Sequence, residues 1–280
     1  MKNDRNIVLV AGASSGLGLA VAGYLFKRGY TVYAGARSFK TDSTEQNPEG
    51  RKGILNKVYL DVTDQASIDR VIQQIIDREG RLDVLVNCAA IIVLGPVEEI
   101  SMEEYRGVIE TNLFGTLRMC KGAIPIMRKQ GNGLIVNFSS ALGILAIPYQ
   151  SAYIASKFAV EGLTEALSME VKKFGIDVVI IEPGDHRYSS EVYRPHAVKA
   201  DLPDSPYSGS FKKVTANIEK DEANGSYPIG VAKLVYKIIN NEKPRLRYTV
   251  GQFVEKLAFV VKKLLPGRLF EKAIFAYYHR

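Results

Sequence analysis

The residues that most constrain the fold of this chain read Asn6-Ile7-Val8-Leu9-Val10-Ala11-Gly12-Ala13-Ser14-Ser15-Gly16-Leu17-Gly18. The run from 6 to 12 is almost continuously apolar and carries β-branched side chains, which is typical of a strand buried on both faces. An apolar pattern of helical period follows the glycines and stops at Gly29. Strand, glycine turn and helix in this order predict a site where a pyrophosphate lies on the positive N-terminus of the helix. A glycine turn that binds no ligand is the alternative interpretation.

Strand and helix patterns alternate along the rest of the chain. We expect strands at residues 31–36, 57–60, 82–86, 134–138, 177–182 and 247–250. We expect helices at 64–78, from the capping box Ser101-Met102-Glu103-Glu104 onward, at 152–174 and at 231–240, with a polar loop at 41–53. Such alternation requires a parallel sheet with right-handed crossovers. The sequence therefore predicts one doubly wound α/β domain of the Rossmann type over residues 1–280.

The strand expected at residues 31–36 ends without an acidic residue. NAD-binding units of this kind carry one about 20 residues beyond the glycines, where it holds the adenosine ribose hydroxyls. Here the chain reads Ala36-Arg37-Ser38, and the next acid is Asp42. An arginine at this place suits the 2′-phosphate of NADP(H). We therefore expect NADP(H) as the cofactor; the alternative is an arginine that is only solvated at a strand end.

Tyr153 and Lys157 are four residues apart, so on a helix they lie on one face. A phenol has a pKa near 10, and lowering it by about three units requires roughly 4 kcal/mol of preference for the phenolate. An ammonium about 4 Å away, at an effective dielectric constant near 20, supplies on the order of 4 kcal/mol. Lys157 can therefore make Tyr153 a general acid and base, with Ser140 within reach to donate to a carbonyl. An ordinary surface pair is the alternative, because about one Tyr-x-x-x-Lys spacing is expected by chance.

Composition limits the class of protein. The chain is 46% apolar and 24% charged, as in an ordinary globular protein. No apolar segment reaches the roughly 18 residues of a membrane span, and the N-terminus lacks a signal-peptide pattern. We therefore expect the protein to be cytoplasmic. We expect Cys88 and Cys120 to be reduced thiols in apolar surroundings, and the three scattered histidines predict no metal site. The net charge of +7 comes with no nucleic-acid-binding signature, so no nucleic-acid partner is expected.

Seven short motifs occur together in this chain. They are Gly12-x-x-x-Gly16-x-Gly18, Leu60-Asp61-Val62, Asn87-x-Ala89, Asn112, Ser140, Tyr153-x-x-x-Lys157 and Pro183-Gly184. With these motifs the chain resembles the short-chain dehydrogenase/reductase family over about residues 5–250. Each motif alone is weak, but seven in the family's order and spacing are very specific.

The resemblance implies a role for each matching residue. It makes Tyr153 the general acid/base, Lys157 the group that lowers its pKa and holds the nicotinamide ribose, and Ser140 the donor to the substrate carbonyl. It makes Asn112 the residue that holds a water in the proton relay. It also places Asp61 at the adenine ring and gives Asn87 the support of the central strand. The full set of residues expected at the cofactor is Gly12, Ser14, Ser15, Gly16, Leu17, Gly18, Arg37, Asp61, Val62, Asn87, Ala89, Tyr153, Lys157, Pro183 and Gly184.

The chain departs from the family pattern at three places. Ala11 replaces the usual threonine before the first glycine, and Asn87 is followed by Cys88-Ala89-Ala90 in place of Asn-Ala-Gly. Both changes concern strand support rather than chemistry. Tyr188 replaces the threonine four residues after Gly184, which alters the expected contacts to the nicotinamide amide but not the reaction class.

Residues 185–228 are polar and contain several prolines. In the family this region is the lobe that closes over the substrate. Asp185-His186-Arg187 follow a strand at the carboxyl edge of the expected sheet, where ligands of open α/β folds bind. Either Asp185 and Arg187 pair with solvent or with each other, or Arg187, helped by His186, faces the substrate or the pyrophosphate. In the second case we expect a substrate with an anionic or strongly polar group on a lipophilic body.

Residues 252–280 read as an amphipathic basic tail of two helices separated by Pro266-Gly267. From Gly251 to Arg280 the chain has six Lys/Arg and two acids, a net charge of +4. Such helices dock on their own core or on a second subunit of a homo-oligomer, or lie on an anionic membrane surface. Deleting the chain from Phe253 onward is expected to affect solubility or assembly more than the chemistry.

The expected function is NADP(H)-dependent interconversion of a secondary alcohol and a ketone. In the reductive direction NADPH gives hydride to the carbonyl carbon while Tyr153 protonates the oxyanion that Ser140 holds. Similarity to members that act on steroids and retinoids suggests a lipophilic, steroid-like small molecule, by analogy only. A dinucleotide sensor without catalysis has no use for Asn112, Ser140, Tyr153 and Lys157 together. A serine hydrolase, the other alternative, lacks the Gly-x-Ser-x-Gly elbow.

Overall fold

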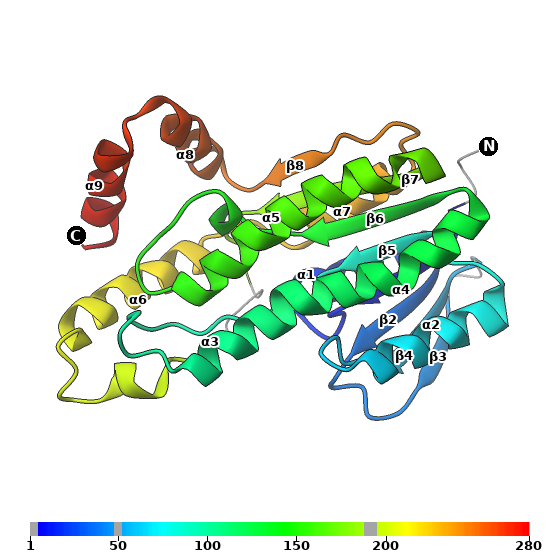
Figure 1. The fold of residues 1–280 in the computed structure, drawn as a ribbon, viewed down its shortest axis with the longest axis horizontal. Coiled ribbons are helices and arrows are strands. Elements are labelled where there is room, and N and C mark those ends of the chain that lie inside the picture. The colour runs from blue at the N-terminus through cyan, green and yellow to red at the C-terminus, as the bar shows by residue number, and fades with distance from the viewer. Residues whose placement is uncertain (1–4, 48–51, 188–194, 280) are drawn as a thin grey trace.

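The sheet at the centre of the molecule is almost entirely parallel (Figure 1). The computed structural model describes residues 5–47, 52–187 and 195–279, and within them eight strands lie in the order β3-β4-β2-β1-β5-β6-β7-β8. Their bounds are β1 Ile7–Ala11, β2 Thr31–Ala36, β3 Ser43–Gln46, β4 Ile54–Tyr59, β5 Val84–Asn87, β6 Gly133–Phe138, β7 Ile176–Pro183 and β8 Arg247–Val250. Every neighbouring pair is parallel except β3 and β4. The prediction of a doubly wound α/β fold is confirmed.

The antiparallel edge strand β3 lies where the sequence predicted only a polar loop, at residues 41–53. All four of its residues are exposed, so no apolar alternation marks it as a strand. Side-chain contacts fix it on β4: Thr44 Oγ1 donates to Asn56 Oδ1 at 2.8 Å, and Lys57 forms an ion pair with Glu45 at 2.6 Å. The expected strand 57–60 correspondingly begins earlier, at Ile54.

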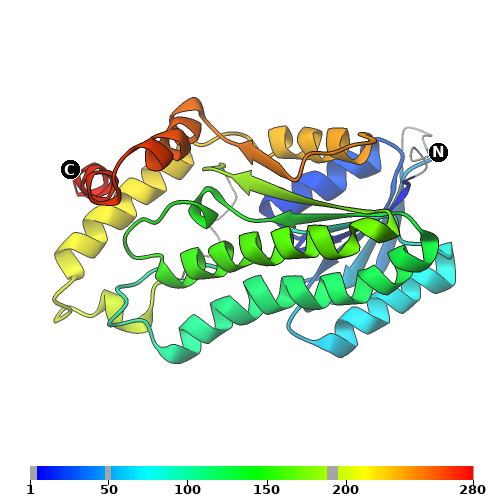
Figure 2. The same cartoon turned by 45° about the horizontal axis from the view of Figure 1, so that its top comes forward.

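Helices cover both faces of the sheet, as Figure 2 shows. Helices α1 (Gly16–Lys27) and α7 (Ile229–Ile239) pack on one face, and α2 (Gln65–Glu79) and α5 (Ser151–Val171) lie on the other. The sequence of strand β1 is apolar throughout because both of its faces are buried. Val8 and Val10 pack in the core layer with α1 and α7, Leu9 packs in the opposite layer, and all three are fully buried.

A long helical segment crosses the second face and contains a π-helical turn. It consists of α3 (Met102–Ile109), the π turn η1 (Glu110–Phe114) and α4 (Gly115–Gln130). The predicted capping box at its start is confirmed: Glu104 N donates to Ser101 Oγ at 3.1 Å, and Ser101 N donates to Glu104 Oε2 at 2.7 Å. The π turn carries Asn112, whose side chain is completely buried. Turns of this kind occur frequently at functional sites.

The remaining helices gather at the end of the molecule where the strands terminate, toward the left in Figure 1. They are α6 (Ser208–Ala223), α8 (Phe253–Leu264), α9 (Gly267–Tyr278) and the short helices η2 (Ala141–Gly143) and η4 (Val198–Asp201), while η3 (Lys172–Phe174) follows α5. These helices therefore cover the edge of the sheet at which a ligand is expected, beyond the carboxyl ends of the strands.

Within the described ranges, none of the helices combines the length and the apolar character needed to cross a bilayer.

Candidate active site

In the turn after β1, the backbone at Gly12 lies close against the backbone that follows β5. Gly12 has a φ of +82°, a region that favours glycine, and a Cβ added there would lie 2.6 Å from the backbone of Ala89. A Cβ added to Gly18 would meet the Gly12 carbonyl oxygen. The first turn of α1 contains no acidic residue, so the positive end of the helix dipole is not compensated by an acid. This close glycine cradle at a helix N-terminus fits the pyrophosphate of a dinucleotide.

One pocket of about 660 Å³ extends from this turn along the carboxyl edge of the sheet. It begins where β1 has β2 on one side and β5 on the other, which is the topological switch point of the sheet. Most of the residues expected at the cofactor line it: Gly12, Ser14, Ser15, Gly16, Leu17, Gly18, Arg37, Val62, Ala89, Tyr153, Lys157, Pro183 and Gly184. Arg37 is exposed and, with Ser38, lines the part of the pocket beyond β2.

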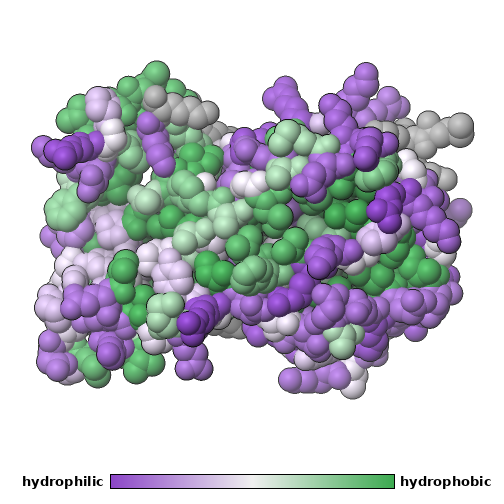
Figure 3. Space-filling view, in the orientation of Figure 1, coloured by the Kyte–Doolittle hydropathy of each residue, from purple (hydrophilic) through white to green (hydrophobic). Residues whose placement is uncertain are grey.

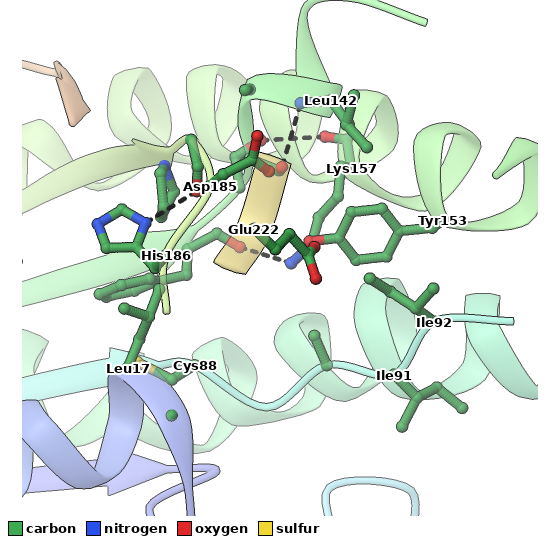
Figure 4. A pocket seen from close by; sticks show the side chains of 18 of the residues that line it. Leu17, Cys88, Ile91, Ile92, Leu142, Tyr153, Lys157, Asp185, His186 and Glu222 are labelled. Atoms are coloured by element: carbon green, nitrogen blue, oxygen red, sulfur yellow. Dashed lines mark hydrogen bonds between the residues drawn. The ribbon is translucent and has the colours of Figure 1, made fainter. Parts of the chain in front are cut away.

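Lys157 lies at the buried centre of this pocket (Figure 4). Its Nζ donates to the Phe138 carbonyl oxygen at 2.8 Å and lies 5.5 Å from the centre of the Tyr153 ring. Burial lowers the pKa of Lys157 to about 8, although the nearby Cys88 and Glu161 act in the opposite direction. Helix α5 thus places the ammonium beside the phenol of Tyr153, as the four-residue spacing predicted.

Ser140 follows β6 and lines the same pocket as Tyr153 and Lys157. Its Oγ accepts a hydrogen bond from Leu142 N at 3.1 Å, which caps the short helix η2. A hydroxyl that accepts from the backbone retains its own O–H for donation. Ser140 can therefore donate to a substrate oxygen while the Leu142 amide holds it in place.

Comparison with models of known protein families gives one match that covers most of this chain. The family model described as short chain dehydrogenase matches residues 6–192, which contain the glycine turn, Ser140, Tyr153 and Lys157. The chain belongs to the short-chain dehydrogenase/reductase family. The resemblance drawn from the seven motifs is confirmed, and the serine hydrolase alternative is set aside.

Curated relatives within this family are similar over nearly the whole chain. The chain is 36% identical over 272 residues to a 3-ketodihydrosphingosine reductase of Bacteroides thetaiotaomicron, covering 97% of each protein. It is 32% identical over 257 residues to retinol dehydrogenase 8 of Bos taurus, covering 88% of this chain and 82% of that protein. Both relatives are named for oxidoreductase activities, one on 3-ketodihydrosphingosine and the other on retinol.

Solved structures agree with the fold. A short-chain dehydrogenase from Streptomyces avermitilis superposes with a TM-score of 0.77 at 31% identity, over 93% of this chain and 92% of that one. ElxO with NADP bound superposes with a TM-score of 0.69 at 27% identity, over 88% of this chain and 97% of that one. The arrangement of strands and helices is therefore that of the short-chain dehydrogenase/reductases.

Two residues expected at the cofactor do not line the pocket. Asp61 accepts hydrogen bonds from the Thr63 amide at 2.9 Å and the Thr63 hydroxyl at 2.7 Å, so its carboxylate shapes the turn after β4. Asn87 donates to Asn137 Oδ1 at 2.8 Å, between β5 and β6. The structure thus gives Asn87 the strand-supporting role that the resemblance implied, whereas contact of Asp61 with an adenine ring stays a prediction.

Asn112 is likewise outside the lining and holds two parts of the site together. Its Oδ1 accepts from the Ile91 amide at 2.8 Å, and its Nδ2 donates to the Ile91 carbonyl at 2.9 Å and to Ser156 Oγ at 2.9 Å. Ile91 lines the pocket, and Ser156 precedes Lys157 on α5. The structure therefore shows Asn112 in a positioning role, and its part in a water-mediated proton relay stays a prediction.

The cluster that follows β7 separates into two parts. Asp185 and His186 line the pocket, and burial lowers the pKa of His186. Arg187 does not line it: its Nε donates to the Gly225 carbonyl at 3.0 Å, and its guanidinium donates to the Tyr227 hydroxyl at 3.0 Å and lies over the Tyr227 ring. The hypothesis that Arg187 faces the substrate is therefore wrong, and the anionic substrate that followed from it loses its basis. Tyr188, the third departure from the family pattern, lies outside the described residues.

The C-terminal tail forms part of the pocket wall. Ala258 of α8 and Ile274, Tyr277 and Tyr278 of α9 all line it. Phe259 and Phe270 pack with Leu145, so the tail docks on its own chain beside the catalytic loop. The tail therefore contributes to the wall of the pocket, and the expectation that deleting it affects assembly more than chemistry stays a prediction. Its two helices, broken at Pro266, were correctly predicted from the apolar spacing.

Several pocket residues carried no signal in the sequence. Apolar walls come from loops and helices distant in the chain, and Gln150 and Glu222 add polar groups between them. Gln150 precedes Tyr153 by three residues at the start of α5, which is the one hint of its position. Glu222 lies in the last turn of α6, and no motif linked that helix to the catalytic residues.

Proposed function

We propose that this short-chain dehydrogenase/reductase is an NADP(H)-dependent enzyme that interconverts a secondary alcohol and a ketone on a lipophilic small molecule. The observation that carries the proposal is one shared pocket. The glycine cradle for a dinucleotide lies at one end, and Ser140, Tyr153 and Lys157 lie beside it. A sensor that has lost catalysis has no need for a buried lysine against a tyrosine in that pocket.

The side chains of the catalytic site each have a separate role in the proposed proton transfer. Ser140 donates its O–H to the substrate oxygen, and the Tyr153 phenol gives its proton to that oxygen as the carbonyl is reduced. The Lys157 ammonium, fixed on the Phe138 carbonyl, stabilises the phenolate that remains. Asn112 positions Lys157 indirectly, through Ser156 and the backbone of Ile91.

NADP(H) is the cofactor we propose. When bound, it supplies or accepts the hydride. Gly12, Gly16 and Gly18 leave room for the pyrophosphate, Arg37 offers a guanidinium to the 2′-phosphate, and Pro183-Gly184 close the cradle at the end of β7. The solved structure of the relative ElxO with NADP bound supports the same choice.

A lipophilic substrate suits the pocket walls. Beside Tyr153 the lining is largely apolar and is formed by Ile91, Ile92, Leu142, Leu145, Ile147, Ala258 and Ile274. The relatives named for 3-ketodihydrosphingosine and for retinol support a lipid ketone or alcohol. A steroid-like substrate remains a prediction from analogy, and residues 185–228, which include α6, are proposed as the lobe that closes over whichever body is bound.

The proposal is tested by NADPH oxidation with a panel of ketones that have steroid, isoprenoid and long-chain bodies. Oxidation with at least one lipophilic ketone, abolished in Tyr153→Phe, is the expected result. Tight NADPH binding with no turnover of any ketone, and no turnover of the matching alcohols with NADP⁺, would instead establish the non-catalytic sensor. The panel also separates the steroid-like from the long-chain substrate.

The exposed apolar surface supports two proposals about partners. Figure 3 shows apolar side chains across the middle of the molecule, where α5 lies, and the exposed Phe158 and Met169 of α5 suit a homo-oligomer contact. On the tail, Leu257, Val260 and Leu264 are exposed within a segment of net charge +4, which suits peripheral contact with an anionic membrane. The protein would then be cytoplasmic and membrane-associated.

Sedimentation with anionic and with neutral vesicles, after the subunit number has been measured in solution, tests both proposals. Binding to anionic vesicles only, lost in Val260→Asp, supports the membrane contact. A lower subunit number in Val260→Asp would show that a second copy covers the tail instead.

A further inference from the structure

The pocket contains acidic side chains that the proposed reaction does not use. They are Asp185, Asp221, Glu222 and Glu255. We infer that the pocket recognises a ketone that carries a protonated amine close to the reacting carbon, with the Glu222 carboxylate accepting from the ammonium. This inference rests on the proposed function and deepens it, because it names the substrate as an amphiphilic amino ketone.

The balance of charge at the substrate end favours a cation. Among the described residues that line the pocket, the lysines and arginines are Arg37 and Lys157. Arg37 lies beyond β2 at the end assigned to the adenosine, and Lys157 is occupied with the Phe138 carbonyl. Arg187, which could have bound an anion, is turned toward Tyr227. An anionic substrate would therefore face four carboxylates, whereas an ammonium would be attracted by them.

Of the four carboxylates, Glu222 is the one that Figure 4 shows beside Tyr153. Glu222 extends from the last turn of α6 into the cavity, on the side where Tyr153 lies (Figure 4). A carboxylate there reaches a substituent near the carbonyl that Tyr153 protonates.

Gln150 provides an independent indication of a donor on the ligand. Its side chain lines the pocket and is only 2% exposed, and its Oε1 has no hydrogen-bond partner among the described residues. A buried carbonyl oxygen without a donor is costly, so a ligand N–H or O–H is expected to complete it. Gln150 lies one helical turn before Tyr153, so a donor that it binds is also close to the reacting carbon.

A metal site and a purely solvated rim account less well for the acidic side chains. A metal ion would need several ligands that converge, and the described residues contain no group of three or more His, Cys, Asp or Glu side chains placed to hold one. A solvated rim would leave the Gln150 oxygen without a donor. The apolar walls then take the rest of the ligand, which makes it an amine with an alkyl or similar chain.

The test compares two ketones that differ only in the amine. One is 3-ketodihydrosphingosine, which carries its amine beside the ketone on a long alkyl chain, and the other is the same ketone with hydrogen in place of the amine. We expect the wild type to prefer the amino ketone in kcat/KM with NADPH by roughly tenfold to a hundredfold, as expected for a hydrogen bond to a charged group. Glu222→Gln should remove most of that preference, because it should lower kcat/KM for the amino ketone about tenfold more than for the amine-free ketone.

Two further variants keep the test specific. Glu219→Gln changes an exposed carboxylate on the same helix outside the pocket, so it should alter neither ketone. Gln150→Met keeps the volume of the side chain and removes its oxygen, so it should also lower the preference for the amine. Equal use of both ketones by the wild type, or equal losses on both in Glu222→Gln, would overturn the inference and leave the proposed function intact. No NADPH oxidation with either ketone or with the wider panel would overturn the two together.

Discussion

The Nζ of Lys157 donates to the carbonyl oxygen of Phe138, the last residue of β6, at 2.8 Å. This bond fixes the lysine between the strand that leads to Ser140 and the helix that carries Tyr153. One buried cation therefore connects both elements of the catalytic site. Its burial also weakens its hold on a proton, since a low-dielectric surrounding disfavours the charged form.

The lowered pKa of Lys157 predicts how activity depends on pH. Below a pH of about 8 the free enzyme keeps the ammonium that stabilises the phenolate of Tyr153, and above it the charge is lost. We expect kcat/KM for ketone reduction to fall as the pH rises through about 8, because kcat/KM reports the free enzyme. The measurement is a pH profile with an amine-free ketone, whose own charge does not change. Lys157→Arg, which keeps its charge, should show lower activity without this decline, and an unchanged decline would assign the ionisation to another group.

Tyr153→Phe removes the proton donor and leaves the ring in place. We expect kcat to fall by roughly 10²–10⁴, the usual contribution of general acid–base catalysis, because water must then protonate the oxyanion. NADPH binding, followed by the change in its fluorescence, should stay within a few-fold of wild type. Turnover close to normal in this variant would remove Tyr153 from the mechanism.

The sequence predicted the parts of the site that are local in the chain. The turn at Gly12, the helix that starts near Tyr153 and the strand before Ser140 all follow from short patterns of apolar residues and glycine. A parallel sheet then brings these segments to one edge, because all its strands end there. For this reason the catalytic residues and most of the cofactor cradle could be placed before the structure was known.

The parts that could not be predicted depend on contacts between distant segments. Nothing local distinguishes Glu222 from the other acids of α6, and it lines the pocket together with residues of the tail helix α9, on which α6 packs. The π turn around Asn112 has the same residue pattern as an ordinary helix, so its cross-connection from Ile91 to Ser156 was not visible. Edge strand β3 is held by polar side chains and lacks the apolar period by which strands are recognised.

Arg37→Ala should reduce the preference for NADPH over NADH. A charge-assisted contact with the 2′-phosphate is worth roughly 1.5–3 kcal/mol, so we expect the ratio of kcat/KM values to fall by roughly tenfold to 150-fold. Lys40→Ala is a matched control, since Lys40 is also an exposed cation after β2 but does not line the pocket. An unchanged ratio in Arg37→Ala, or an initial preference for NADH, would show that Arg37 is only solvated.

Phe270 and Leu269 are neighbours on α9, but one is buried and the other is exposed. Substituting each of them tests whether docking of the tail affects substrate binding in the pocket. Phe270 is 9% exposed and packs with Leu145 and Phe259, whereas Leu269 is 53% exposed. Phe270→Ala should weaken docking of the tail by about 3–5 kcal/mol, whereas Leu269→Ala should change it by less than about 0.5 kcal/mol. Because the tail encloses the substrate end and Leu145 lies close to Ser140 in the chain, we expect Phe270→Ala to raise KM for a lipophilic ketone several-fold, while NADPH affinity stays unchanged.

Limited proteolysis and steady-state kinetics on the two variants provide the measurement. Faster cleavage between α8 and α9 together with a raised KM in Phe270→Ala alone is the expected pattern. If cleavage becomes faster and KM stays the same, the tail docks on the chain without shaping the pocket. If both variants lose activity to the same extent, the effect comes from the exposed surface of α9, and the contact with Leu145 is not what closes the site.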